Sequence, residues 1–227
     1  MDSVGPLIEG IAGSSKVLAS DAYKWFEYLK GQNTRRLKLH YQNSPKVGLP
    51  DRISTAFVGG GSHWFVEFQF GTTSDIYLSE WLPSEGMSFD RRKTHYFHIG
   101  RDTTHLDDAS LSVTEAGEKL ASVLHELAEF ARKHDHLKHW AVNFNNAITT
   151  LESSEPQESD EFLPVGAYSV KAHQLILGSF ASWVFGGMGS WSDLAFNDED
   201  QEHYESLSET LYTALCDAIV SGVNSFS

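Results

Sequence analysis

The spacing of apolar residues changes from a strand-like period to a helix-like period partway along this chain, and this change limits the fold class. Before residue 100, the segments RLKLHYQ and HWFVEFQF alternate in the two-residue period of a strand, so that Trp64, Val66 and Phe68 share one face. After Ser112, leucines and alanines recur every three or four residues, as on the buried stripe of a helix. Strands followed by helices predict an α+β fold, with an antiparallel sheet in the N-terminal half packed by helices and a C-terminal helical hairpin.

Turn and capping residues give the approximate ends of the elements. The segment SDAYKWFEYLKG predicts a short helix that ends at Gly31, and RISTAFV, GGGS and HWFVEFQF predict the strand, turn and strand of a hairpin. DIYLSEWL and THYFHIG predict two further strands. The SVTE capping box predicts the start of a helix at residue 113. Further helices are predicted over residues 136–151, 168–185 and 198–223.

One stretch interrupts these patterns strongly enough to be an exposed loop or linker. ESSEPQESDEFLP, residues 152–164, combines proline and serine with five acidic residues. We therefore expect residues 1–152 to form an α+β domain of strands followed by helices. Residues 165–227 are then a C-terminal helical subdomain, which can also belong to one single domain with the first part.

The net charge of −14 is unevenly distributed along the chain. Residues 1–138 carry 16 basic and 18 acidic side chains, whereas residues 139–227 carry 13 acidic side chains and Lys171 as their one basic side chain. A polyanionic surface repels nucleic acid and anionic membranes, and it accelerates the encounter with a basic protein. The charge therefore favours a basic protein as partner, with no nucleic acid and no membrane. The alternative is that the acidic surface only keeps the protein dissolved.

No sequence motif for catalysis, metal binding or cofactor binding is complete. HELAE, beginning at His125, lacks the second histidine of a zinc-protease helix, and the helical stripe places His125 and Glu129 on the polar face. GGGSH and GGMGS lack the lysine of a phosphate-binding loop. Cys216 lies inside an apolar helical segment, where a thiol is usually inert. We therefore predict no catalytic residue, no metal and no cofactor. A metal-dependent hydrolase that uses the histidine-rich middle of the chain remains the alternative.

The cysteine count and the terminal sequence bear on location. A single cysteine forms no internal disulfide and fits a reducing compartment. The first twenty residues lack the basic start and apolar run of a signal peptide, and the apolar stretch 175–189 is shorter than the ~20 residues of a membrane-spanning helix. We expect a cytoplasmic protein.

The stretch from Trp183 to Tyr212 holds three glycines, two tryptophans and seven carboxylates, with no Lys or Arg. Acidic residues at a helix start face the positive end of its dipole, which accounts for part of the acidity. Helix capping does not account for the whole segment 172–227, which has eight acidic residues and no basic one. An exposed helix selected only for stability would normally carry lysines four residues from its carboxylates.

The segment GGMGSWSDLAF, followed by an acidic helix and LYTALCDAIVSGVNS, resembles the C-terminal part of bacterial immunity proteins. These are cytoplasmic antidotes encoded beside polymorphic toxins of contact-dependent or type VI systems. The resemblance covers about forty residues, and it implies a non-enzymatic protein that binds a cognate toxin domain and blocks its active site. The acidic face of this chain would then occlude a basic active-site cleft of the toxin. A secretion adaptor or chaperone is a further alternative.

The expected contact surface lies in this same stretch. We expect Trp191 and Tyr204 to be its aromatic anchors, because a few desolvated aromatic and charged residues dominate most interfaces. The alternative for Trp191 is that it packs under the glycine turn. The acidic residues expected to enter a basic cleft are Asp193, Asp198, Glu199, Asp200, Glu202 and Glu205.

Overall fold

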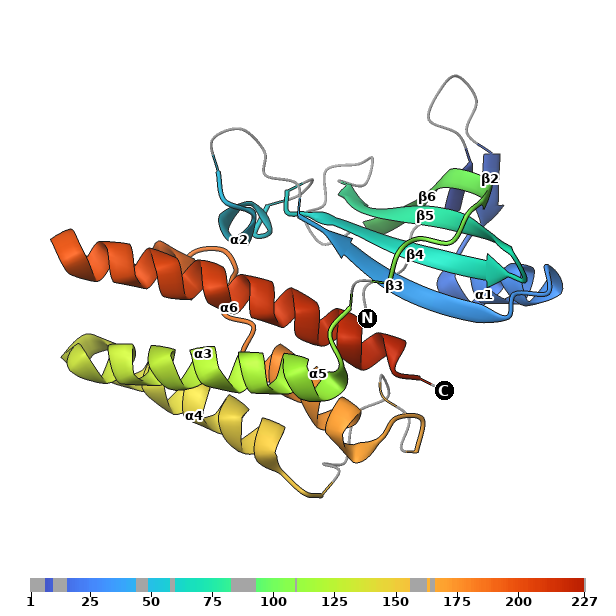
Figure 1. The fold of residues 1–227 in the computed structure, drawn as a ribbon. Helices are drawn as coiled ribbons and strands as arrows, with labels where there is room; N and C mark the ends of the chain where they lie inside the picture. Colours follow the sequence, from blue (N-terminus) through green and yellow to red (C-terminus); the bar gives the residue numbers. More distant parts are fainter. Residues whose placement is uncertain are drawn as a thin grey trace. The chain divides into compact units, whose positions relative to one another are not determined.

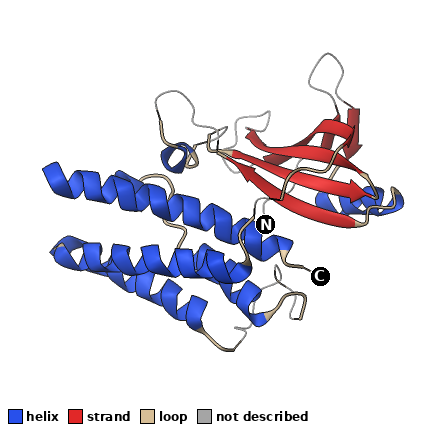
Figure 2. Cartoon of the chain, in the orientation of Figure 1, coloured by secondary structure: helices blue, strands red, loops and turns tan. Residues whose placement is uncertain are grey.

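The computed structural model describes residues 7–9, 16–43, 49–57, 60–82, 93–108, 110–155, 163 and 166–226. Its chain divides into two compact units, Met1–Asp108 and Ala109–Ser227. The first unit is built on a β-sheet and the second consists of helices, as the colouring by secondary structure shows (Figure 2). The α+β prediction is therefore confirmed. No helix in the described ranges combines the length and the apolar composition that a membrane span requires.

The sheet of the first unit contains six strands in its described part, in the order β2-β1-β6-β5-β4-β3. Neighbouring strands are antiparallel, except that β1 and β6 are parallel. The predicted strands RLKLHYQ, HWFVEFQF, DIYLSEWL and THYFHIG all lie within this sheet. The strand bounds are β1 Leu7–Glu9, β2 Lys16–Ala19, β3 Arg36–Gln42, β4 His63–Phe70, β5 Thr73–Leu82 and β6 Lys93–Thr103 (Figure 1).

Helix α1, Ala22–Gly31, covers one face of this sheet. Asp21 caps the helix by accepting a hydrogen bond from the Lys24 backbone N–H at 2.9 Å. Trp25 is buried, and its ring centroid lies 5.3 Å from that of Phe68 and 5.4 Å from that of Tyr77. The face of β4 that the two-residue alternation predicted as apolar is therefore the face on which α1 packs.

The predicted hairpin strand RISTAFV is wrong, because its described residues, 52–57, belong to helix α2, Asp51–Ser54, and to the turn that follows it. Val58 lies outside the described residues. Gly60 and Gly61 bring the chain back against α2 instead of reversing a hairpin. The Gly61 backbone N–H donates to Ser54 Oγ at 2.9 Å, and a β-carbon at Gly60 would collide with the Ser54 carbonyl oxygen. The antiparallel partners of β4 are accordingly β3 and β5.

The described helices of the second unit form a closed bundle in which α3 packs against α4 and α6, and α5 against the same two helices. The predicted capping box begins α3: Ser112 Oγ accepts from the Glu115 N–H at 3.2 Å, and the Glu115 carboxylate accepts from the Ser112 N–H at 2.9 Å. The bounds are α3 Val113–Lys133, η1 Asp135–Leu137, α4 Lys138–Glu152, α5 Val170–Ala181, η2 Trp191–Asp193 and α6 Asp198–Asn224 (Figure 1).

The boundary between the units differs from the predicted division into 1–152 and 165–227. It lies between Asp108 and Ala109, because α3 and α4 share their apolar stripes with α5 and α6. Gly178 of α5 lies so close to α4 that a β-carbon there would stand 2.5 Å from Leu151 Cδ2. The acidic stretch 152–164 therefore joins two helices of one bundle. Apart from residues 152–155 and 163, that stretch lies outside the described residues.

One histidine in this bundle is expected to reduce its stability. His173 of α5 is 4% exposed, and among the described residues neither of its ring nitrogens has a hydrogen-bond partner. A buried polar group without a partner costs about 1–3 kcal/mol. We expect His173→Leu to raise the free energy of unfolding by roughly 1 kcal/mol, measured by urea unfolding followed by far-UV circular dichroism. His125→Leu on the exposed face of α3 is the control, with little expected change. Equal stabilisation by both variants would show that burial is not the cause.

Candidate functional site

The negative charge of the protein belongs almost entirely to the helical unit. Residues 109–227 carry 18 acidic and 5 basic side chains, whereas residues 1–108 carry 13 acidic and 12 basic ones. The net charge of the helical unit is therefore −13 and that of the sheet unit is −1. A surface that attracts a cationic partner is therefore expected on the exposed faces of the bundle.

One strongly acidic face among the described residues lies on the N-terminal half of α6. Tyr204, Leu207 and Leu211 point into the bundle and are buried. Three glutamates at three-residue intervals lie on the exposed side, as expected for helix positions that are neighbours on the surface. We call these residues the acidic ridge: Glu199, Glu202 and Glu205.

The acidic ridge has no cationic partner among the described residues. The lysine and arginine ion pairs of the described bundle join Lys119 to Asp217 at 2.6 Å, Lys138 to Asp135 at 2.7 Å, and Arg132 to Glu129. Glu205 accepts a hydrogen bond from Gln201 Nε2 at 2.8 Å, which neutralises no charge. The lysines and arginines of the bundle therefore leave the negative potential of the ridge directed to solvent.

The other acidic residues predicted for the site lie off this ridge. Asp193 is exposed in η2, and its carboxylate accepts a hydrogen bond from the Gly189 N–H at 2.5 Å. Asp200 is exposed on another side of α6, where its Oδ2 lies 3.9 Å from His134 Nε2. Asp198 is the first residue of α6, and its side chain lies outside the described residues.

The two predicted aromatic anchors are in the wrong place for a surface contact. Trp191 is 0% exposed and Tyr204 is 2% exposed. A closed set of three hydrogen bonds joins them to Ser208: the Trp191 indole N–H donates to Ser208 Oγ at 2.8 Å, Ser208 Oγ donates to the Tyr204 carbonyl at 2.6 Å, and the Tyr204 hydroxyl donates to the Trp191 carbonyl at 2.6 Å. The alternative reading of Trp191 as core packing is the correct one.

Rings from several helices surround Trp191. Its centroid lies 5.2 Å from Phe144 and 5.5 Å from Trp140, both of α4, at nearly perpendicular interplanar angles. Edge-to-face packing of this kind adds stability beyond the area that each ring buries. In the sequence, the only local indication of this hydrogen-bond network is Ser208, four residues after Tyr204. A buried serine on a helix can donate to the backbone carbonyl of the preceding turn and accept from a neighbouring donor.

The histidines do not form a metal site in the described parts of the chain. No three His, Cys, Asp or Glu side chains there lie close enough together to hold one ion. His125 is exposed on α3, and Glu129 pairs with Arg132. His134 lies between aromatic rings, with its centroid 4.9 Å from those of Phe130 and Phe196. The alternative of a metal-dependent hydrolase gains no support from these positions.

A buried carboxylate of the sheet unit, which the sequence analysis missed, organises a polar network. Glu67 of β4 is fully buried on the sheet face opposite Phe68. His40 Nε2 lies 2.8 Å from Glu67 Oε2, and Ser74 Oγ donates to Glu67 Oε1 at 2.5 Å. The Leu106 backbone N–H donates to Glu67 Oε1 at 3.0 Å. Glu67 thus holds the segment after β6 against the sheet.

The same segment is held at two further points. His105 Nδ1 lies 2.6 Å from Ser74 Oγ, and Lys38 forms an ion pair with Asp108. Burial raises the pKa of Glu67, but hydrogen bonds from Ser74, the Leu106 backbone and His40 outweigh it and leave the pKa below the ordinary value of 4.5. Burial, together with nearby Arg36, lowers the pKa of Lys38. Both carboxylate oxygens of Glu67 have hydrogen-bond partners, namely Ser74 and Leu106 at Oε1 and His40 at Oε2. The network therefore fits a structural clamp and not a reacting group.

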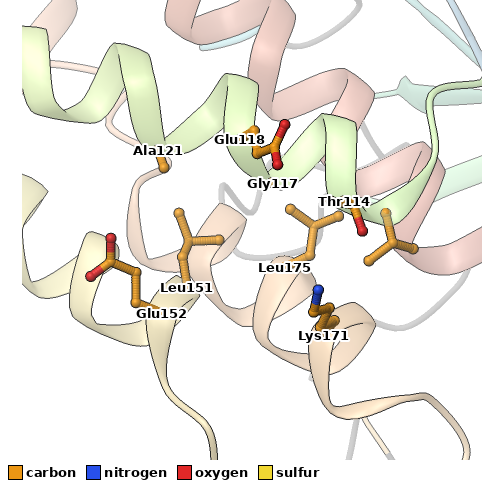
Figure 3. Close-up of a pocket in the computed structure, with 9 residues that line it drawn as sticks. Thr114, Gly117, Glu118, Ala121, Leu151, Glu152, Lys171 and Leu175 are labelled. Carbon is orange, nitrogen blue, oxygen red and sulfur yellow. The ribbon is translucent and has the colours of Figure 1, made fainter.

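A cleft of about 270 Å³ lies between α3, α4 and α5 (Figure 3). Leu151 and Leu175 form part of its lining, together with small residues of α3. The charged groups Glu118, Glu152 and Lys171 lie around the leucines and do not converge on one point (Figure 3). Without convergent polar groups, this cleft lacks the arrangement that fixes a small ligand.

Comparison with known proteins gave no match to a family model, to a curated protein or to a solved structure. Within the described residues, the geometry and charge of the bundle favour the acidic ridge as the candidate binding surface.

Proposed function

We propose that this protein binds a cationic protein through the acidic ridge of α6, and that its biological role is to neutralise a protein toxin. The observation that supports binding is the exposed row of Glu199, Glu202 and Glu205, which lacks a cation among the described residues. The helix carrying this row has no Lys or Arg along its length. A toxin is the favoured partner because the segment from GGMGSW onward resembles that of immunity proteins.

The mechanism is occlusion of a basic active-site cleft. Many toxins that act on nucleic acids or nucleotides use clusters of lysine and arginine, since their substrates are anionic. A row of carboxylates on a rigid helix presents a complementary potential to such a cleft. Long-range attraction then raises the association rate, and short-range ion pairs with desolvated contacts slow the dissociation.

The proposal predicts that a gene next to this one encodes a protein with a toxic C-terminal domain, and a direct test uses that domain. The purified chain is expected to bind that domain and to abolish its activity at a one-to-one ratio. Binding without inhibition would indicate a secretion adaptor or chaperone and would reject toxin neutralisation. Absence of binding, with an active and folded toxin domain, would reject the proposal as a whole.

The carboxylates of the acidic ridge should raise the rate at which this protein associates with the toxin domain. Glu199→Lys, Glu202→Lys and Glu205→Lys combined are expected to lower the rate roughly 10- to 100-fold at low salt and to remove most of its salt dependence, measured by stopped-flow fluorescence.

A matched control changes the net charge equally at other exposed helix positions: Glu118→Lys, Glu126→Lys and Glu152→Lys. This control is expected to lower the rate only a few-fold, through the diffuse charge of the bundle. Equal losses in both triple variants would show that net charge matters and the ridge does not.

A further inference from the structure

The loop between α5 and η2 presents one fully exposed apolar side chain. Met188 is 101% exposed, the highest value among the large hydrophobic residues described as exposed. Gly186, Gly187 and Gly189 surround it in the sequence, so that no neighbouring side chain covers it. Methionine is unbranched and polarisable, and it adapts well to the shape of a partner's pocket.

This loop is held in a definite conformation by hydrogen bonds. The Ser190 N–H donates to the Gly187 carbonyl at 3.1 Å, and Ser190 Oγ donates to the Gly186 carbonyl at 3.0 Å. The Gly189 N–H donates to the Asp193 carboxylate at 2.5 Å, with Gly189 at φ +84°, a conformation that favours glycine. The backbone that carries Met188 is therefore ordered before any partner arrives, which reduces the entropic cost of binding.

The loop lies beside the helix that carries the acidic ridge. On one side of Met188, the Phe185 ring packs on Tyr212 of α6 with centroids 5.4 Å apart. On the other side, the Trp191 indole bonds to Ser208 of the same helix. The residues between Phe185 and Trp191 thus follow α6 back toward its N-terminal half, in which Glu205 of the ridge lies.

We propose that Met188 is the apolar anchor of the surface to which the acidic ridge supplies the charge. This inference rests on the proposed function and adds the chemistry of the partner: a cationic protein surface that contains an apolar pocket wide enough for an unbranched thioether side chain. A second copy of this chain or an anionic membrane is disfavoured as occupant, because the net charge of −13 on the helical unit would repel both.

An interface of this kind separates two kinetic roles. Charges around the contact act mainly on the association rate, whereas a desolvated anchor in a pocket acts mainly on the dissociation rate. Asp193, which lies off the ridge, fixes the loop by accepting the hydrogen bond from the Gly189 N–H.

The experiment uses the full chain and the toxin domain named above, with association and dissociation rates measured by surface plasmon resonance. Met188→Gln is expected to raise the dissociation rate roughly 10- to 30-fold and to leave the association rate within a factor of two. Met188→Leu, which keeps an apolar side chain of similar size, is expected to stay within a few-fold of the unmodified protein. Thermal unfolding should not change in either variant, since the side chain is exposed.

Three other outcomes would overturn the inference, and they differ in meaning. If Met188→Gln dissociates like the unmodified protein while the ridge variant still associates slowly, the anchor is rejected and the proposed function stands. If the unmodified chain does not bind the toxin domain, the proposed function is rejected and the anchor with it. Equal effects of Met188→Gln and Met188→Leu would also reject an apolar pocket, because leucine retains the apolar contact.

Discussion

Trp191→Ala is expected to lower the free energy of unfolding of the helical unit by about 3–5 kcal/mol, the usual cost of removing a large buried aromatic side chain. Trp191 is completely buried, its ring packs on Phe144 and Trp140, and its indole N–H bonds to Ser208. Alanine leaves a cavity among these rings and a hydroxyl that has lost its donor. Urea unfolding of the full chain, followed by far-UV circular dichroism, measures this loss because most of the described helical residues belong to the bundle.

Two milder variants separate the ring from its hydrogen bond. Trp191→Phe keeps an aromatic ring without the N–H, and Ser208→Ala leaves the buried N–H without its acceptor, at a cost of about 1–3 kcal/mol. The variant that combines Trp191→Phe and Ser208→Ala should lose less free energy of unfolding than the sum of the two single losses, because both substitutions remove the same hydrogen bond. An unchanged midpoint for Trp191→Ala would show that this side chain is not in the core and would restore it as a candidate surface anchor.

Glu67→Gln is expected to lower the free energy of unfolding of the sheet unit by about 2–4 kcal/mol, because an amide replaces a buried carboxylate whose partners are donors. An amide nitrogen at the Oε1 position would face the Leu106 N–H, which can only donate, and one at the Oε2 position would face His40 Nε2 and the donating Gln69 amide. The local consequence is release of the segment after β6. Amide hydrogen exchange at Leu106, whose N–H bonds to Glu67, should therefore accelerate more than exchange in the strands.

The same carboxylate gives this prediction a pH dependence of known sign. The pKa of Glu67 is lower in the folded protein than its ordinary value of 4.5. Its stabilising contribution is thus complete above about pH 4.5 and disappears as the pH falls through the lowered folded-state pKa. The difference in stability between the unmodified protein and Glu67→Gln should shrink over that acidic range. Glu27→Gln, at an exposed position of α1, is the control and should show no such difference. A Leu106 amide equally protected in the Glu67→Gln variant would contradict the clamp.

The sequence alone predicted much of the fold, because an element that packs one face against a core must repeat its apolar residues at its own period. The alternation in HWFVEFQF placed Phe68 on the face that α1 covers, and the capping box at Ser112 located the start of α3. The prediction failed at RISTAFV, where Gly60 and Gly61 pack against Ser54. A glycine run has the same local signature whether it reverses a hairpin or permits a close backbone approach.

The candidate site depends more strongly on tertiary structure. The sequence by itself determined that the C-terminal part carries almost all of the charge, and that Glu199, Glu202 and Glu205 lie on a helix without basic residues. Only the tertiary structure decided that Trp191 lies in the core while Met188, three residues earlier, is exposed. Aromatic residues suit a core and an interface equally well, so their type does not distinguish the two locations. Contacts with α4 and α6 place Trp191 in the core. These helices are distant from Trp191 in the sequence, so the local spacing of apolar residues does not predict the contacts.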